Sequence, residues 1–430
     1  MALIEPRILK GFRDFLPRQE LTRREMIEKI ERSFRSFGFV PIDTPALEYA
    51  EILLGKGGGE TEKQIYRFSD QGGRDIALRF DLTVPFARFI AEHKSELTFP
   101  FKRYHIAKVW RGENTQRGRY REFIQCDFDI AGSDSAAADF EILLIMKNTL
   151  QILCKSGITI RINHRGLFYR FLTSLGLQER AAEILRQVDK LAKIGRDGVE
   201  ELLKSSISRD ESQKILDFIS LGTDGDFDTV LEKLKAAAGE GEDTKRLDEL
   251  RCYIKDAGIT GSFILDPSIT RGLDYYTGVV YETFLDKLPG IGSVCSGGRY
   301  DNLAGLYSKE LVPGVGSSIG LDRLEAALEE LREREKHSGY ADAAVVCLKA
   351  DDAGKIQAAA ERFRRCGLNC EVFLDVKKAS QQFMLAEKKD IPWVIIPDFV
   401  SGRFTLRNIA GRENREDVDF DTAAAIIKET

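Results

Sequence analysis

Apolar residues recur at helical spacing over residues 19–37 and predict an amphipathic helix near the start of the chain. Residues 39–47 then have a strand-like composition, but they contain Pro41 and Pro45. Proline cannot donate a backbone hydrogen bond to a neighbouring strand, so it is confined to edge strands and irregular positions. We therefore expect this strand at a sheet edge or at an interface.

The patterning then alternates between sheet and helix. Short strand-like runs with turns between them, at 77–80 and 101–130, are typical of an antiparallel sheet, and a helical pattern follows at 135–155. From 166 to 257 the pattern is almost wholly helical, and at 262–320 strand-like, glycine-rich sequence resumes. We interpret the helical segment as an insertion, with a spacer or packing element as the alternative to a functional role.

After a charged linker at 331–340, strands and helices of similar length alternate to the end of the chain. The expected strands are AAVVCL, NCEVFL, PWVIIP and RFTLRNI, and the expected helices lie around 352–366, 377–389 and 421–428. This alternation predicts a small α/β domain of about 90 residues.

Composition limits the function classes. The 430 residues suit two or three domains, and 43% of them are hydrophobic, which is enough for full cores. The formal net charge of −5 gives no global basic field for nucleic acid, although a local basic face can lie under that sum. The seven cysteines lack metal-ligand spacing, so we expect reduced core thiols. Because no apolar run approaches the ~20 residues of a membrane span and no signal peptide is evident, we expect a soluble cytoplasmic protein without a membrane partner.

The stretch RGENTQRGRYREFIQCDFDIAG, residues 111–132, has the composition of a polar site on a hairpin. We expect Arg111 and Glu113 on one strand, a loop at 114–118, and a returning strand that begins with Arg119. One alternating face of that strand would carry Phe123, Gln125, Asp127 and Asp129. Arginine forks match phosphate and carboxylate oxygens, and a phenylalanine can stack on a base. The alternative is a salt-bridged hairpin without a ligand.

Three glycine-rich stretches follow: RGLDYYTGVVYE at 271–282, CSGGRYDNL at 295–303 and PGVGSSIGLDRLEAAL at 313–328, with Arg323 in the first turn of the expected helix. The third has the strand-to-helix outline of a phosphate cradle but lacks the GK[ST] of a P-loop, as does GKGGGE at 55–60. Each stretch alone is weak evidence for a ligand site, but the order of the stretches along the chain is stronger evidence.

In that order the chain resembles a class II aminoacyl-tRNA synthetase of the histidyl-tRNA synthetase family. GFVPIDTPALE resembles motif 1, FKRYHIAKVWRGENTQRGRYREFIQCDFDIAG motif 2 and GVGSSIGLDRL motif 3, while RGLDYYTGVVYE and SGGRYD resemble the two histidine-specific motifs. The resemblance covers nearly the whole chain. It implies an α+β fold in which a six-stranded antiparallel core sheet is flanked by helices.

The resemblance implies a ligase that joins histidine to ATP as histidyl-adenylate and passes the histidyl group to the 3′ end of tRNA(His). By motif match, Arg111 contacts the ATP α-phosphate, Glu113 the adenine edge and Arg119 the outer phosphates. Phe123 and Arg323 sandwich the adenine, and Arg271 bridges the amino-acid carboxylate and the α-phosphate. Mg²⁺ is expected on the phosphates, with no protein side chain assigned as its ligand.

The resemblance also implies a histidine site. Asp81, Thr83 and Gln125 match the residues that take the α-ammonium group, Asp129 and Tyr276 match those that read the imidazole, and Tyr275 belongs to the same site. Many bacterial members carry Glu at the positions of Asp81 and Asp129, so DLTVP and QCDFDIAG resemble the eukaryotic-type branch. Aspartate keeps the negative charge of glutamate, but its side chain is shorter.

The implied organisation has four segments. A catalytic domain spans 1–165 and 258–330 around a helical insertion at 166–257, and an anticodon-binding domain spans 341–430. Motif 1 implies a homodimer, and the loop residues 114–117 would face the tRNA acceptor stem. The C-terminal segment has 15 acidic and 14 basic residues, so an anticodon contact needs a local face, for which we suggest Lys377, Lys378 and Gln382, with a solvated helix as the alternative.

Two rival classes share parts of this pattern. One is the catalytically inactive paralogue that partners ATP phosphoribosyltransferase, which generally lacks the anticodon-binding domain and parts of the histidine motifs. The other is a pseudo-synthetase that senses uncharged tRNA, usually beside a kinase-like segment. Here Arg111, Arg271, Tyr276, Arg323 and the C-terminal domain are all present and no kinase-like segment accompanies them, which favours the enzyme.

Overall fold

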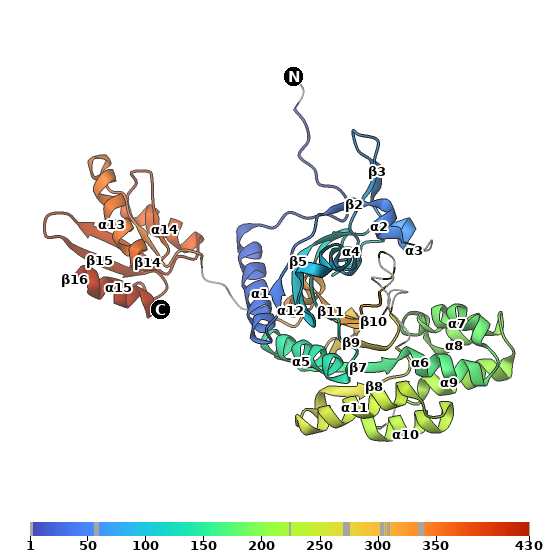
Figure 1. Ribbon diagram of the computed structural model, residues 1–430. Helices are drawn as coiled ribbons and strands as arrows, with labels where there is room; N and C mark the ends of the chain where they lie inside the picture. The colour runs from blue at the N-terminus through green and yellow to red at the C-terminus, as the bar shows by residue number, and fades with distance from the viewer. Residues whose placement is uncertain are drawn as a thin grey trace. The chain divides into compact units, whose positions relative to one another are not determined.

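The computed structural model describes residues 3–55, 60–222, 225–269, 276–301, 305, 307, 310–333 and 339–429. The chain divides into two compact units, one of Met1–Asp14 with Glu25–Arg334 and one of Phe15–Arg24 with Glu335–Thr430. Figure 1 shows the course of the chain and the element labels used below.

The first unit is built on a large mixed sheet. In the described residues it has eight strands in the order β1-β5-β6-β11-β10-β9-β7-β8. The six strands from β5 to β7 in this order are antiparallel, while β1 and β8 join the two edges in parallel. Their bounds are β1 Val40–Pro41, β5 Phe101–Trp110, β6 Glu122–Ala131, β7 Ile158–His164, β8 Phe263–Leu265, β9 Val279–Leu285, β10 Cys295–Tyr300 and β11 Gly314–Gly320.

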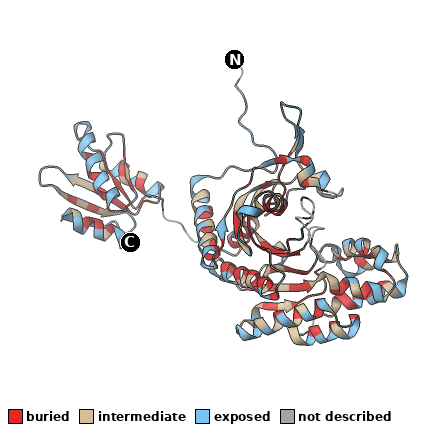
Figure 2. Cartoon of the chain, viewed as in Figure 1, coloured by how far each residue is buried: buried red, intermediate tan, exposed pale blue. Residues whose placement is uncertain are grey.

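Helices cover this sheet and bury its apolar side chains. The helix α5 (Ala136–Leu153) contributes more buried residues than any other of these helices, and Figure 2 shows buried positions along its length. The Ser135 hydroxyl accepts a hydrogen bond from the Ala138 amide and so begins the helix in the manner of an N-cap. The other helices beside the sheet are α1 (Pro17–Ser36), α4 (Thr83–His93) and α12 (Leu321–Glu330).

A small antiparallel sheet, β2-β4-β3, lies within the same unit next to two short helices. Its strands are β2 Leu47–Tyr49, β3 Arg67–Ser69 and β4 Asp75–Leu78, and the helices are α2 Ala50–Leu54 and α3 Glu60–Gln64. This sheet has a small core of its own, formed by Ala50, Leu53, Ala77, Phe80 and Val84. The last of these residues lies in the first turn of α4. This placement matters because α4 begins at the candidate site.

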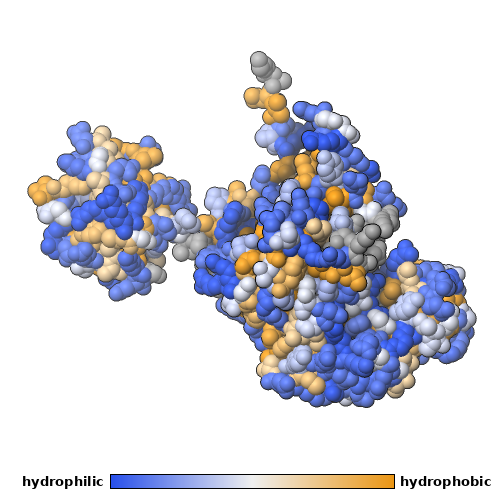
Figure 3. All heavy atoms as spheres, viewed as in Figure 1, coloured by the Kyte–Doolittle hydropathy of each residue, from blue (hydrophilic) through white to orange (hydrophobic). Residues whose placement is uncertain are grey.

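Between β7 and β8 the chain forms consecutive helices, which lie together beside these strands in Figure 1. They are α6 Arg165–Ser174, α7 Ala181–Val188, α8 Leu191–Lys204, α9 Arg209–Ser220, α10 Phe227–Ala238 and α11 Glu242–Asp256. Their apolar faces join the main core, and the face drawn in Figure 3 is mostly hydrophilic. The Ser208 and Glu211 side chains form a capping box at the start of α9.

The second unit contains a five-stranded sheet in the order β13-β12-β14-β15-β16. Its first three strands are parallel and the last two antiparallel. The strands are β12 Ala343–Val345, β13 Cys370–Val372, β14 Trp393–Asp398, β15 Arg403–Asn408 and β16 Asn414–Val418, with α13 Ala353–Arg365, α14 Ala379–Lys388 and α15 Phe420–Lys428.

The structure contains α4 and β7, which no predicted element covered, and it also differs from the expected elements at two sheet edges. The strand predicted over 39–47 is only the two residues of β1, although its edge position is confirmed. The edge strand β16 was not predicted, because four of its five residues are exposed and polar or charged and so give no alternating pattern. Among the described residues, no helix is long and apolar enough to cross a membrane.

Candidate active site

The hairpin β5–β6 places its predicted site residues partly on a strand and partly on a loop. The strand β5 ends at Trp110 and β6 begins at Glu122, so Arg111, Glu113 and Arg119 lie in the loop rather than on strands as expected. The loop is nevertheless ordered, because the Arg111 amide donates to the Arg121 carbonyl at 2.9 Å and continues the hairpin ladder.

The tip of the hairpin packs against α12. Gln116 and Arg119 form a bridge around a turn that contains Gly118 with a φ of 72°. A Cβ at Gly118 would lie 3.3 Å from the Cα of Arg323, so the turn needs a glycine for both its conformation and its close approach. This contact brings Arg119 and Arg323 to the same cavity.

The cavity has a volume of about 350 Å³, which is at the lower end of the range for small-molecule sites. Ten of the predicted residues line it: Asp81, Thr83, Arg111, Glu113, Arg119, Phe123, Gln125, Asp129, Tyr276 and Arg323. They come from five separate segments between β4 and α12, which only the fold brings together. Arg271 and Tyr275 lie outside the described residues.

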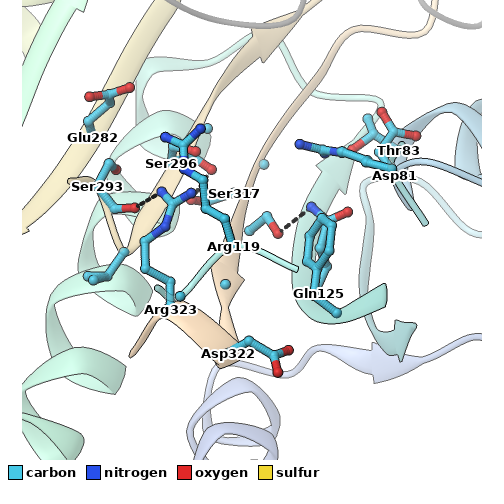
Figure 4. Close-up of a pocket in the computed structure, with 18 of the residues that line it drawn as sticks. Asp81, Thr83, Arg119, Gln125, Glu282, Ser293, Ser296, Ser317, Asp322 and Arg323 are labelled. Atoms are coloured by element: carbon cyan, nitrogen blue, oxygen red, sulfur yellow. Dashed lines mark hydrogen bonds between the residues drawn. The ribbon is translucent and has the colours of Figure 1, made fainter. Parts of the chain in front are cut away.

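Arginines gather around one part of the cavity. Arg111 Nε donates to the Phe80 carbonyl at 2.9 Å, and its guanidinium carbon lies 5.2 Å from the centre of the Phe123 ring. Arg323 Nη1 donates to the Ser293 carbonyl at 2.5 Å, a bond drawn in Figure 4. Arg119 lies 3.9 Å from the Glu113 carboxylate. This part is therefore cationic and has an aromatic wall, which suits a nucleotide.

Hydrogen-bond acceptors gather at the other end. Figure 4 shows Asp81, Thr83 and Gln125 together, away from Glu282, Ser293 and Arg323. Gln125 Nε2 donates to Ser318 Oγ at 2.9 Å, and its Oε1 is buried without a hydrogen-bond partner in the part of the chain that the structure describes. Asp81 Oδ1 accepts from the Val84 amide at 3.1 Å and so fixes the first turn of α4. An unmet acceptor beside a buried carboxylate suits a cationic ammonium group.

Asp129 is a further buried acceptor among the residues that line the cavity. It is 2% exposed, its Oδ1 accepts from the Tyr300 hydroxyl at 2.6 Å, and its Oδ2 forms an ion pair with Arg103 Nη2 at 2.7 Å. Burial raises the pKa of its carboxyl group, while Arg103 and Tyr300 act against that rise. Next to it, burial raises the pKa of Asp127 to about 7, with Arg103 opposing.

The register between β6 and β11 leaves room for a ligand. Gly316 pairs with Asp129, Ser318 with Asp127 and Gly320 with Gln125, so each polar residue of β6 faces a small one. A Cβ at Gly316 would lie 1.9 Å from Asp129 Oδ1. The sequence pattern did not reveal this pairing, although the small residues of GVGSSIG were a signal for close approach.

Several functional candidates were missed from the sequence. The cavity lining also includes Tyr281, Glu282, Ser293, Ser296, Ser317, Ser318 and Asp322, and Arg103 and Tyr300 contact Asp129 from behind. Asp322 is buried, accepts from the Ile124 amide at 2.8 Å and forms an ion pair with Arg13. Arg13 and Tyr300 stood in quoted or neighbouring motifs, but no pattern singled them out.

A family model described as histidyl-tRNA synthetase matches residues 11–324, and one described as an anticodon binding domain matches residues 342–430. The chain belongs to the histidyl-tRNA synthetase family. It is 56% identical to a histidine–tRNA ligase of Treponema denticola over 402 residues, which are 92% of this chain and 90% of that protein. It is 44% identical to a histidine–tRNA ligase of Rhodopirellula baltica over 427 residues, 96% of each chain.

A solved histidyl-tRNA synthetase structure from Nostoc sp. has a TM-score of 0.88 at 32% identity and covers 99% of this chain and 100% of that chain. The predicted α+β class, with a helix-flanked sheet core and a C-terminal α/β domain, is therefore confirmed. The central six antiparallel strands match the expected core, and the two parallel edge strands extend it.

We suggested three residues for an anticodon-contacting face of the C-terminal segment, and for one of them this prediction was wrong. Gln382 is fully buried, its Nε2 donates to the carbonyls of Cys347 and Lys377, and its Oε1 accepts from the Cys347 amide. It therefore fixes the loop after β12 rather than facing solvent. Its position in α14 and its amide chemistry gave no indication of this from sequence.

Proposed function

We propose that this protein is a histidine–tRNA ligase, which activates histidine with ATP to histidyl-adenylate and transfers the histidyl group to the 3′ end of tRNA(His). The observation that carries the proposal is a cavity with two chemical ends in a member of this family. One end presents arginines and an aromatic ring, and the other presents the unmet Gln125 acceptor and the Asp129 carboxylate.

The cationic end is assigned to ATP. Arg111 binds the α-phosphate, Glu113 the adenine edge and Arg119 the outer phosphates, while Phe123 and Arg323 hold the adenine between them. These roles agree with the loop position of Arg119 beside Glu113 and with the shared cavity of Phe123 and Arg323. Planar guanidinium groups match phosphate oxygens in pairs, and they also stack on aromatic faces.

The acceptor end is assigned to histidine. Asp81, Thr83 and the Gln125 oxygen, which has no hydrogen-bond partner among the described residues, take the α-ammonium group, because three acceptors satisfy its three N–H donors. Asp129 accepts one ring N–H, and the Tyr276 hydroxyl pairs with the other ring nitrogen. Tyr275 belongs to the same site. A ring that lacks either group would leave a buried polar atom unpaired, which discriminates strongly between substrates.

The reaction then needs positioning rather than a nucleophilic side chain. A histidine carboxylate oxygen attacks the α-phosphorus of ATP, the bond to the β-phosphate oxygen breaks, and pyrophosphate leaves. Arg111, with Arg271 from the histidine motif, relieves the repulsion between the two anions and stabilises the charge that develops. The tRNA 3′-terminal hydroxyl next attacks the histidyl carbonyl, and AMP leaves.

Mg²⁺ is the expected metal on the ATP phosphates. Among the described residues no group of three His, Cys, Asp or Glu side chains could hold a metal ion. A Mg²⁺ ion usually keeps several waters and takes most other ligands from substrate phosphates, so a single carboxylate of the cavity lining, such as Glu282, would be sufficient to hold it. When bound, it would neutralise phosphate charge.

The proposal includes the partners and organisation implied by the family. The catalytic domain comprises 1–165 and 258–330, the helical insertion 166–257 and the anticodon-binding domain 341–430. A homodimer would pair through the segment around β1, and a cytoplasmic location follows from the tRNA substrate. These points rest on the family and on the edge position of β1.

Histidine-dependent ATP–pyrophosphate exchange by the purified protein tests the proposal. We expect exchange with histidine and none with other amino acids. Absence of exchange would contradict the proposed ligase activity and would favour the inactive paralogue. Binding of tRNA without exchange would favour the pseudo-synthetase. Asp129→Asn should then weaken histidine binding more than ATP binding, because Asp129 lies at the acceptor end.

A further inference from the structure

Both oxygens of the Asp129 carboxylate interact with side chains that do not themselves line the cavity. Tyr300 from β10 donates to Oδ1 at 2.6 Å, and Arg103 from β5 pairs with Oδ2 at 2.7 Å. Among the residues that the structure places, none donates a hydrogen bond of acceptable geometry to Oδ2 despite this ion pair, so Oδ2 keeps capacity for a further donor. Asp129 also lines the cavity, so that further donor can come from a ligand.

Several contacts hold the buried Arg103 side chain in one position. Arg103 stands opposite Asp129 in the β5–β6 ladder and is 0% exposed. Its guanidinium carbon lies 4.2 Å from the centre of the Phe86 ring, and its Nη2 lies 3.4 Å from the Leu82 carbonyl. Leu82 and Phe86 flank the start of α4, so Arg103 connects the ammonium-binding segment to Asp129.

A residue retained only for stability would not be expected to bury a guanidinium group in this way. Arg103 Nε and Nη1 are buried without hydrogen-bond partners among the described residues. Buried polar groups are nearly always satisfied, and a buried ion pair is often no more stable than apolar side chains of similar volume. A site role accounts for an arginine at this position better than packing does.

Arg103 is the dominant positive charge near two buried carboxyl groups. Burial raises the pKa of both Asp127 and Asp129, and in each case Arg103 is the first opposing cause. The other charged or titratable groups in this network are Asp81, Tyr276, Tyr281, Tyr300, His105, Arg79 and Asp43. Of these, Arg79 and His105 lie toward Asp43 rather than Asp129.

We propose that Arg103 is a positioning and specificity-determining residue for the amino acid: with Tyr300, it holds Asp129 as an oriented anion that can only accept a hydrogen bond. The inference rests on the proposed function, in which the ligand here is the histidine ring. A neutral imidazole must then present its N–H to Asp129 and its bare nitrogen to Tyr276. Loss of Arg103 lets Asp129 take up a proton, and this constraint disappears.

The test compares three variants in the exchange assay: Arg103→Leu, Arg103→Lys and Tyr300→Phe. KM for histidine and KM for ATP are measured at pH 6.5, 7.5 and 8.5. Each KM is divided by that of the parent at the same pH, which cancels the titration of histidine itself. Thermal unfolding of each variant verifies that it is folded.

For Arg103→Leu, the histidine KM ratio should be about tenfold or more at pH 6.5, because removing an adjacent opposite charge raises a carboxyl pKa by one to three units. The ratio should fall as the pH rises and Asp129 ionises, while the ATP ratio stays within about twofold. Arg103→Lys keeps the charge, so its histidine ratio should be smaller and flat with pH. Tyr300→Phe removes one donor and should show the pH trend of Arg103→Leu at smaller amplitude.

A histidine ratio for Arg103→Leu that is flat with pH, or an equal rise in both KM values, would overturn the proposal. If Arg103→Leu does not fold, unchanged histidine KM in both Arg103→Lys and Tyr300→Phe would overturn it instead. Failure of the proposed function is a separate result, because the parent itself would then show no histidine-dependent exchange.

Discussion

Gly316→Ala would place a methyl group against the residue assigned to the imidazole. Gly316 stands opposite Asp129 between β11 and β6. A Cβ there would lie 1.9 Å from Asp129 Oδ1, 2.3 Å from its Cγ and 2.8 Å from the Phe128 carbonyl oxygen. The Phe128 oxygen belongs to the strand backbone and cannot turn away, so the Asp129 side chain has to move.

The size of this movement sets the expected effect. Ordinary contact begins near 3.4 Å, so the carboxylate would have to retreat by about 1.5 Å. A misplacement of about 1 Å at a reacting or recognition group can cost a hundredfold, so we expect the histidine KM to rise between about tenfold and a hundredfold. The overpacked strand pair should also lose about 1–3 kcal/mol of stability.

The assay is ATP–pyrophosphate exchange with histidine and ATP varied separately. KM for ATP should change little, because Arg111 and Arg323 lie in the cationic part of the cavity. Gly290→Ala is the matched control, since no atom of the described residues lies within 4 Å of a Cβ there and its φ is not positive. A Gly316→Ala protein with the histidine KM of the parent would refute the placement of Asp129.

Three further predictions follow from other contacts. Burial raises the pKa of Asp127 from 3.8 to about 7, so the folded state keeps a proton that the unfolded state has lost; stability should therefore fall by up to roughly 4 kcal/mol as pH rises from about 4 to about 7. Asp127→Asn should remove most of that fall in thermal unfolding at pH 5 and pH 8, and an unchanged fall would contradict this account. Arg13→Met removes the partly exposed ion pair with Asp322, which lines the cavity next to Arg323, and should raise the ATP KM roughly fivefold and the histidine KM less; an equal rise in both KM values would contradict a specific effect of this ion pair on the ATP end of the cavity. Arg119→Ala should raise the ATP KM about tenfold or more, while the exposed Lys108→Ala on the same hairpin should stay near the parent value; matching values for the two variants would remove Arg119 from the phosphate site.

The sequence predicted local structure well where one pattern was sufficient. The amphipathic run at 19–37 is α1, the helical stretch at 135–155 is α5, and the alternation of the last segment matches β12 to α15. It failed at edges, where the 39–47 strand shrank to β1 and where exposed β16 lacked an apolar face. Edge strands bury few side chains, so their sequence carries little periodic signal.

The same division applies to the candidate site. The residue types and their order determined the family, and ten of the predicted residues meet in one cavity. Only the tertiary structure decided what stands behind them: Arg103 and Tyr300 on Asp129, and Gly316 in front of it. These contacts depend on the register of strands that lie up to about 190 residues apart in the chain. A single sequence specifies side chains and short-range periods, but it does not state which residues of distant strands become opposite partners, and that pairing sets both the space and the charge around the ligand.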